Sequence, residues 1–178
     1  GLLDLMGHET QSLKGYATAV SSVTFSPDGK TVLTGNWDNT VKFWDLSGRT
    51  MQTFNGAGGL FRSVVFSPDG NTVLIDNSMN TTKLWDLSGR ELKTFTGNAL
   101  SFSPDGKTVL TNCGIEIAKL WDLSGRELKT FTGKAVAFSP DGRAVLTKTG
   151  INTLKLRDLS DREIQTFKRH KVWGDLAV

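Results

Sequence analysis

The pentapeptide Phe25-Ser26-Pro27-Asp28-Gly29 occurs four times without change, and this repetition decides the fold. The other copies are residues 66–70, 102–106 and 138–142, so successive copies are 41, 36 and 36 positions apart. A second motif, KFWDLSGR at residues 42–49, follows at a fixed distance and recurs as 83–90, 119–126 and, in altered form, 155–162. A constant period of this length indicates a repeat architecture in which each unit is one supersecondary structure.

Each unit reads as four short strands, which in the first copy are residues 20–25, 31–35, 40–45 and 49–54. These segments are rich in Val, Thr, Phe and Leu and are bounded by turn residues. In Ser-Pro-Asp-Gly, Pro presets φ, Asp bonds the nearby backbone and Gly accepts a positive φ. The Leu-Ser-Gly-Arg turn predicts the same left-handed position at Gly48, Gly89 and Gly125, and at Asp161 in the fourth copy.

Four-stranded units of about 40 residues that end in Trp-Asp resemble the blades of WD-repeat propellers. The resemblance spans residues 8 to 168 and rests on three Trp-Asp pairs in register with four Phe-Ser-Pro-Asp-Gly turns. It implies an all-β fold, a β-propeller of four-stranded antiparallel blades, and completion by a second chain stays open. We expect one domain over residues 1–178, with blades at 16–56, 57–97, 98–133 and 134–169 and leftover strands at 9–15 and 170–178.

The copies depart from the family pattern in ways that affect packing. The family's polar network of His, Ser or Thr, Asp and Trp is approached only in the first copy, which has Asp38 where the others have Met79, Ile115 and Ile151. From the Gly at the end of one unit to the Phe of the next turn there are ten positions in copies one and two but five in copies three and four, so a loop and half a strand are missing and we expect smaller blades there. Arg157 replaces the Trp of the fourth copy, and we expect that blade to be the loosest because a lost buried Trp is costly.

Composition excludes several classes of protein. The 178 residues include 38% hydrophobic and 22% charged residues, which is typical of a globular domain, and no apolar run reaches the ~20 residues of a spanning helix. The net charge of +3 is spread along the chain without a basic block, so a nucleic-acid partner is not expected. The lone Cys113 fits a reducing compartment, and we therefore expect a cytoplasmic protein without membrane contact.

The residues that could carry chemistry do not form a site. His8 and His170 are the only histidines, so neither a metal centre nor a base for Cys113 is expected. Cys113 reads as a small buried apolar residue. The repeated aspartates read as turn residues, and the lysines two positions before each Trp read as stems lying along an aromatic ring. We expect no enzyme activity, no catalytic or metal-binding residue and no cofactor.

The copies differ mainly on one rim of the expected propeller, which holds the loops before the first strand and between the second and third strands. The favoured hypothesis is a non-catalytic scaffold or sensor that binds a protein or peptide through this rim, with aromatic and Arg side chains as anchors. The candidate binding residues are Tyr16, Trp37, Asp38, Phe61, Arg62, Met79, Asn80, Glu116, Lys134 and Lys148, joined by Asn77 and Asn112. Loops that vary without binding anything stay open as an alternative.

Two other functions remain open. The leftover segments at both ends indicate either a self-assembly element in which two copies of the chain, as a homodimer, form an eight-bladed ring, or a piece of a longer propeller. A propeller that binds a small ligand or carbohydrate would need polar groups converging on the central channel. Near-identical repeats also resemble the WD-repeat arrays attached to bacterial signalling or defence proteins.

Overall fold

The computed structural model describes residues 2–3, 9–11, 19–55, 61–77 and 79–168, and these residues contain strands and turns but no helix. They form four antiparallel sheets of four strands each, one per sequence repeat, and a two-stranded sheet near the N-terminus. The expected all-β, propeller-like fold of four-stranded blades is therefore confirmed. We number the four large sheets blades 1 to 4 in chain order.

Each blade consists of four strands that follow one another in the chain and in the sheet. Blade 1 holds β3 (Val20–Phe25), β4 (Thr31–Asn36), β5 (Thr40–Asp45) and β6 (Thr50–Asn55). Blade 2 holds β7 (Phe61–Phe66), β8 (Thr72–Asn77), β9 (Thr81–Asp86) and β10 (Glu91–Thr96). Blade 3 holds β11 (Asn98–Phe102), β12 (Thr108–Asn112), β13 (Ile117–Asp122) and β14 (Glu127–Thr132). Blade 4 holds β15 (Lys134–Phe138), β16 (Ala144–Thr149), β17 (Thr153–Asp158) and β18 (Glu163–Lys168).

The strand bounds follow the sequence closely. Two strands of the first copy lie where they were predicted, whereas β4 ends one residue later and β6 is shifted one residue toward the C-terminus. Blades 3 and 4 are smaller, as expected, because β11 and β15 have five residues where β3 and β7 have six. The expected outer strand at residues 9–15 is only partly described: β2 (Glu9–Gln11) pairs with β1 (Leu2–Leu3) in the two-stranded sheet. The expected strand at residues 170–178 lies outside the described residues.

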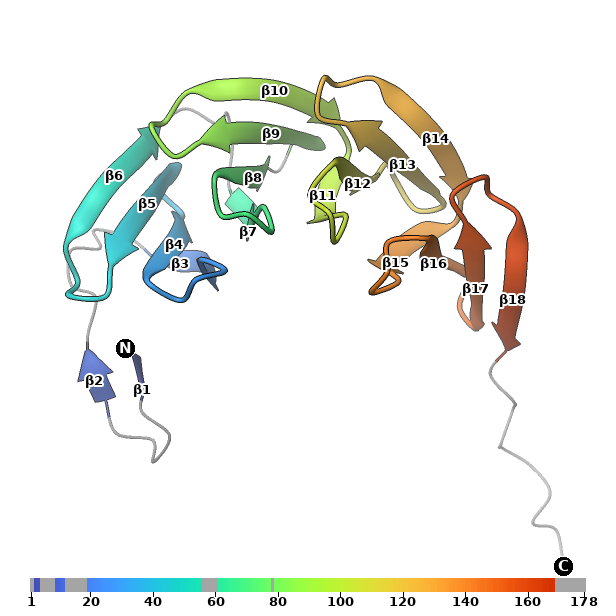
Figure 1. Cartoon of the computed structure of the whole chain (residues 1–178), viewed down its shortest axis with the longest axis horizontal. Helices are drawn as coiled ribbons and strands as arrows, with labels where there is room; N and C mark the ends of the chain where they lie inside the picture. The colour runs from blue at the N-terminus through green and yellow to red at the C-terminus, as the bar shows by residue number, and fades with distance from the viewer. Residues whose placement is uncertain (1, 4–8, 12–18, 56–60, 78, 169–178) are drawn as a thin grey trace, which may run out of the picture.

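The four blades follow one another along an arc that does not close (Figure 1). The first strand of each blade lies on the concave inner side of the arc and the fourth strand on the convex outer side. Blade 1 and blade 4 occupy the two ends of the arc and do not meet. The described part of the chain is therefore an open propeller segment.

The repeated turns are built as their sequence predicts. In blade 1 the hydroxyl of Ser26 donates to Asp28 Oδ1 at 2.6 Å, the Lys30 N–H donates to the same oxygen at 3.1 Å, and Gly29 has φ 68°. The Ser26 hydroxyl and the Lys30 amide hold the pKa of Asp28 below its ordinary value. Asp69, Asp105 and Asp141 accept the same bond from the preceding serine, so all four aspartates are turn residues, as expected.

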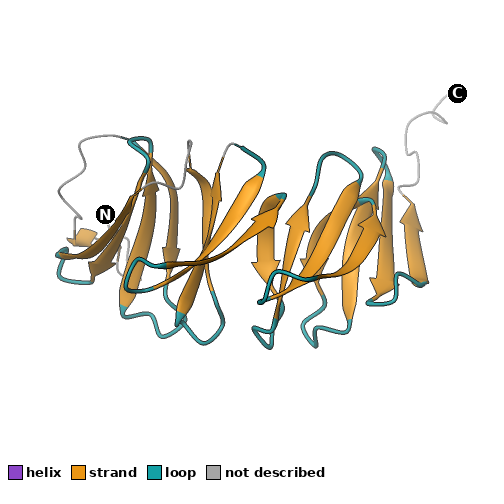
Figure 2. Ribbon diagram, turned by 90° about the horizontal axis from the view of Figure 1, so that it is seen from above, coloured by secondary structure: helices purple, strands orange, loops and turns teal. Residues whose placement is uncertain are grey.

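The turns divide the molecule into two edges, which are seen on opposite sides of the array in Figure 2. The Ser-Pro-Asp-Gly and Leu-Ser-Gly-Arg turns join the first to the second and the third to the fourth strand of each blade. Because neighbouring strands are antiparallel, both turns lie on one edge, which we call the repeated edge. The hairpins between second and third strands, together with the start of each first strand, form the other edge, which we call the variable edge.

The apolar core lies between neighbouring blades. Its three clusters sit at the three junctions, and two of them contain an aromatic pair of the same kind. Phe54 of blade 1 packs on Trp85 of blade 2 with ring centroids 6.1 Å apart, and Phe95 packs on Trp121 at 6.0 Å. The lysine two positions before each Trp lies over its indole, 5.4 to 5.9 Å from the centroid, as the sequence indicates. Each blade therefore depends on the next one to cover its face.

The polar network is more complete than the sequence indicates. The Trp44 indole N–H donates to Thr34 Oγ1 at 2.9 Å, as expected of a partial network in the first copy. The same bond joins Trp121 to Thr111 at 2.9 Å, which corrects the expectation that only the first copy approaches the network. In blade 2 the equivalent acceptor position holds Ile75, and the Trp85 indole N–H is buried without a partner.

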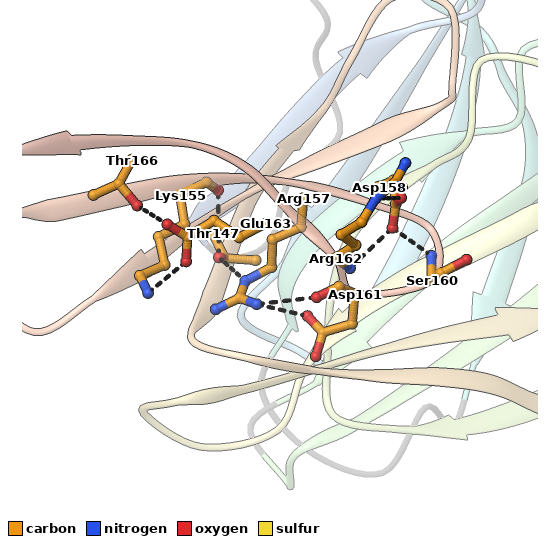
Figure 3. Close-up of polar contacts among 9 residues, drawn as sticks. All are labelled: Thr147, Lys155, Arg157, Asp158, Ser160, Asp161, Arg162, Glu163 and Thr166. Carbon is orange, nitrogen blue, oxygen red and sulfur yellow. Dashed lines mark hydrogen bonds and ion pairs between the residues drawn. The ribbon is translucent and has the colours of Figure 1, made fainter.

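The fourth blade fills its missing Trp position with a charged network (Figure 3). Arg157 is buried, its Nε donates to Thr147 Oγ1 at 3.3 Å, and its Nη1 contacts the carboxylate of Asp161 at 3.0 Å. Asp161 adopts φ 68°, so it tolerates the left-handed position as predicted. The loss of the indole was expected to make blade 4 the loosest blade. The guanidinium of Arg157 occupies the indole position instead.

Candidate protein-interaction surface

The variable edge carries an exposed apolar side chain at a hairpin tip in every blade. Met79, Ile115 and Ile151 stand at the same repeat position, and their side chains are 69%, 87% and 88% exposed. In blade 1 this position is Asp38, and the residue before it, Trp37, is 62% exposed. Apolar side chains of this size are more often partly covered, so four exposed tips on one edge form a distinct surface feature.

The tips are held by bonds within their own hairpins. Asp38 Oδ1 accepts from the Thr40 N–H at 3.1 Å and from its hydroxyl at 2.6 Å. Asn77 Oδ1 accepts from the Met79 N–H at 3.0 Å and from the Thr81 hydroxyl at 2.9 Å. These bonds fix the turn backbone, so the apolar side chains project from a pre-organised frame.

Each of these hairpins contains a residue with positive φ, which follows the tip position in blades 1 and 2 and precedes it in blades 3 and 4. Asn39 and Asn80 have φ of 63° and 57°, and Gly114 and Gly150 stand in blades 3 and 4 with φ of 80° and 60°. In blade 2 the Asn80 carbonyl accepts a bond from the Gly97 N–H at 2.8 Å, which ties the tip to the start of the next blade. Asn80 therefore has a structural role as well as an exposed position.

The variable edge also carries charge. Lys134 and Lys148 are exposed and face each other as register partners on β15 and β16, so positive charge gathers on the variable edge of blade 4. Glu116 of blade 3 is exposed, and its carbonyl accepts from the Gly133 N–H at 2.7 Å. Arg62 is exposed on β7, and its positive charge lowers the pKa of the buried Asp76, which burial nevertheless raises to about 7.

The structure places most of the predicted binding residues on this edge. Phe61 begins β7, where its backbone is the register partner of Asn77, but its side chain and the whole of Tyr16 lie outside the described residues. Asn77 and Asn112 are buried rather than exposed, because Asn77 caps its hairpin and Asn112 bonds the backbone of Ala135 across a blade junction. The exposed set is Trp37, Asp38, Arg62, Met79, Asn80, Glu116, Lys134 and Lys148.

The predicted residues line the edge of four successive blades and do not converge on one pocket. Ile115 and Ile151 are as exposed as any of them but were missing from the predicted binding set. Their signal was present in the sequence, since both stand at the repeat position of Asp38 and Met79. The sequence analysis named them only as replacements for the aspartate of the family's polar network, and it did not consider them as binding residues.

The concave side of the arc offers little to a polar ligand. The first strands of all four blades line a hollow of about 500 Å³, whose lining is mostly apolar, with Thr24, Ser67, Ser101 and Ser103 as its polar residues. Phe25, Phe66, Phe102 and Phe138 are among its lining residues. Carbohydrates and small polar ligands need convergent polar groups, so this lining does not favour the small-ligand alternative.

The described residues contain no group of three or more His, Cys, Asp or Glu side chains placed to hold a metal ion. His8 and His170 lie outside the described residues. Cys113 is half-buried rather than buried, and its Sγ lies 3.4 Å from the Thr96 carbonyl oxygen, to which it donates. Within the described part of the chain no helix is long and apolar enough to cross a membrane.

The known proteins that are similar to this chain match it over a segment of about one repeat. Residues 7–45 match the family described as WD domain, G-beta repeat. The small ribosomal subunit protein RACK1 of Dictyostelium discoideum is 46% identical over 39 residues, which are 22% of this chain and 12% of that protein. The Notchless protein homolog of Arabidopsis thaliana and the vegetative incompatibility protein HET-E-1 of Podospora anserina are each 50% identical over 36 residues. Those 36 residues are 20% of this chain but only 8% and 3% of the two relatives, so the similarity extends over one repeat.

Proposed function

We propose that this chain is a non-catalytic interaction module that binds a protein or peptide through its variable edge; the match of its first repeat to the WD domain family and the four sheets of the same repeat pattern support this. The observation that carries this proposal is the exposed apolar tip of each blade: Trp37, Met79, Ile115 and Ile151. The repeated edge is nearly identical in all four blades, whereas the variable edge differs in each. A surface that differs from blade to blade can distinguish partners, and a uniform one serves as scaffold.

The chemistry of the edge suits an extended partner. Full burial of a Met or Ile side chain contributes about 1.5–3 kcal/mol, and the large indole of Trp37 is the kind of group that anchors interfaces. The tips stand on separate blades, so one small molecule does not cover them, whereas a protein surface or an extended peptide contacts several at once. Arg62 adds a charged anchor on the variable edge of blade 2.

The charge of blade 4 indicates the character of the partner. Lys134 and Lys148 are exposed side by side on β15 and β16. A partner that places apolar residues against the tips and an acidic residue near these lysines would match the edge in both respects. We place this function in the cytoplasm, with no cofactor and no nucleic-acid partner, on the lone Cys113 and the scattered charge of the chain.

Self-assembly with a second copy is the second candidate function. The open arc and the half-exposed Phe167 of blade 4 support it, because within the described residues blade 4 has one face that no other blade covers (Figure 1). It does not compete with the first function, since this face is separate from the variable edge.

Peptides selected from a random library against the immobilised chain provide a test of the first function. Single changes of Trp37→Ala, Arg62→Ala and Met79→Ser should each weaken binding of the selected peptides at least tenfold. Met51→Ser is a matched control for Met79, because Met51 is 51% exposed on β6, away from the variable edge. Peptides that bind all three edge variants as tightly as the original chain would rule the proposal out.

A further inference from the structure

The junction of blades 1 and 2 contains a pocket on the repeated edge, away from the variable edge. Its lining includes the Ser-Pro-Asp-Gly turns of both blades, and its volume is about 550 Å³. Pockets of this size bind ligands in many proteins. The pocket lies between two blades of the chain, so it does not depend on what precedes blade 1 or follows blade 4.

One wall of the pocket is apolar and consists of Phe43, Met51 and Leu87. Phe43 is buried in the core of this junction and Leu87 packs against that core, whereas Met51 is 51% exposed. Blades 2 and 3 have Leu at the positions of Phe43 and Met51, so this wall differs from those of the other junctions. A half-exposed methionine is an adaptable surface that a ligand can cover.

Two carboxylates, those of Asp28 in blade 1 and Asp69 in blade 2, line the same pocket. The preceding serine and the turn backbone hold the pKa of each below its ordinary value, so both are charged at neutral pH. The turn occupies Oδ1 of Asp28, and its Oδ2 accepts no bond from a described residue. All lining residues lie in the described part of the chain, and none of them is a lysine or arginine.

The other junctions supply a cation at the position where this pocket has none. Lys107 and Arg143 follow the turn glycines of blades 3 and 4, and each lowers the pKa of the aspartate in its own turn. Blade 2 has Asn71 at this position, and hydrogen bonds rather than a neighbouring cation lower the pKa of Asp69. Lys30 holds the position in blade 1 and acts on the aspartate of its own turn, but it is not among the lining residues. The pocket therefore combines an apolar wall with uncompensated negative charge.

We propose that this pocket binds the side chain of an arginine that a partner protein presents. The guanidinium takes the place of the cation that Lys107 and Arg143 supply elsewhere, and its methylene groups cover Met51. Arginine suits the pocket because its planar group has five donors, which can bond carboxylates from two turns, and because it is weakly hydrated enough to lie against an apolar wall. This contact lies on the repeated edge and is independent of the function proposed for the variable edge.

NMR of the full chain labelled with ¹³C at its methionine methyl groups tests the proposal. Titration with Nα-acetyl-L-arginine amide should shift the Met51 resonance until it saturates, with a Kd of about 1 mM for so small a probe. The Met79 resonance should stay in place, because Met79 lies on the variable edge. Nα-acetyl-L-citrulline amide has nearly the same shape without the charge, and it should leave Met51 unshifted at the same concentrations.

Two variants test the charge of the pocket. Asp28→Asn keeps an oxygen that accepts from the Ser26 hydroxyl, and Asn71→Lys introduces the residue that blades 1 and 3 have at this position. Each should weaken binding of the arginine probe by about fivefold. Asp141→Asn is the matched control, because Asp141 makes the same turn bond in blade 4 and does not line the pocket. Circular dichroism establishes that the variants are folded.

Three results would overturn the proposal: a Met51 resonance that the arginine probe does not move, an equal response to the citrulline probe, or unchanged affinity in both Asp28→Asn and Asn71→Lys. None of them bears on the variable edge, which the Met79 resonance reports separately. A peptide without arginine or lysine leaves the pocket empty, so Met51 stays a control for such a peptide at the variable edge.

Discussion

The guanidinium of Arg157 donates a hydrogen bond to the hydroxyl of Thr147 at 3.3 Å, in the place where other blades use an indole. In blades 1 and 3 the Trp N–H makes the equivalent bond to Thr34 and Thr111 at 2.9 Å. Arg157 also holds Asp161 in an ion pair, and Asp161 stands where the other blades have glycine (Figure 3). The two replacements in the fourth repeat therefore act together.

Removing Arg157 alone should destabilise the protein more than replacing both members of the pair. Arg157→Ala leaves a cavity and takes the cation from the partly buried Asp161, which should lower the free energy of unfolding by about 2–3 kcal/mol. The double change Arg157→Trp with Asp161→Gly restores the pattern of the other blades and should keep or raise stability. Urea denaturation of the three proteins measures the difference. Equal stability of Arg157→Ala and the original chain would show that the ion pair does not support blade 4.

The blades also differ in whether the buried indole N–H has a hydrogen-bond acceptor, and this leads to a second prediction about stability. Thr111→Val should lower the free energy of unfolding by about 1–3 kcal/mol, because the Trp121 N–H then joins Trp85 as a buried donor without a partner. Ile75→Thr supplies the missing acceptor in blade 2, so it should cost less than the purely apolar truncation Ile75→Val, about 0.5–1.5 kcal/mol. Thermal unfolding followed by tryptophan fluorescence compares them. The reverse order for the two Ile75 variants would contradict this account.

Asp76 predicts a dependence of stability on pH near neutrality. Burial raises its pKa to about 7 in the folded chain, against the lowering effect of Arg62. Between about pH 4 and pH 7 the folded state therefore holds a proton that the unfolded state has released. The free energy of unfolding must fall as the pH rises through this window, and the loss is complete above it.

Asp76→Asn should remove this slope and raise stability above pH 7. Asn112 holds the equivalent position in blade 3, where its amide donates to the Ala135 carbonyl at 3.2 Å and accepts from the Ala135 N–H at 2.8 Å. Asp105→Asn is the control, because the Ser103 hydroxyl lowers the pKa of Asp105 and its effect appears only in acid. Urea denaturation at several pH values gives the profiles. If the free energy of unfolding of Asp76→Asn still falls between pH 4 and pH 7, a group other than Asp76 causes the effect.

The repeat period was enough to predict the blades, their strands and the left-handed turn positions, because these depend on local sequence. The packing between blades could be predicted only in part. The charged network around Arg157 depends on Asp161, four residues away, and on Thr147 of a neighbouring strand. Its prediction from sequence would require all three positions to be considered together. The exposure of Phe167 and Phe25 depends on which blades lie beside them. The sequence of a single repeat does not contain this information.

The variable edge was predicted from differences among the copies, and most of its candidate residues lie there. The exposed Ile115 and Ile151, which lie in the turns before β13 and β17, were missed because the sequence analysis treated them only as replacements at the repeat position of Asp38. Asn77 and Asn112 were misplaced because Asn in a loop suggests exposure, whereas here hydrogen bonds to neighbouring backbone and side-chain groups bury both side chains. Tyr16 and the side chain of Phe61 stay predictions.

The most direct test of the variable edge is NMR of the chain labelled with ¹³C at its methionine methyl groups, titrated with a peptide selected from a random library. Met79 is exposed at the tip of blade 2 and Met51 is exposed on β6, so the two methyl groups report on different surfaces of the same molecule. The account predicts that the Met79 resonance shifts on peptide binding while the Met51 resonance stays in place. A bound peptide that shifts Met51 and leaves Met79 unchanged would contradict the claim that this protein binds through its variable edge.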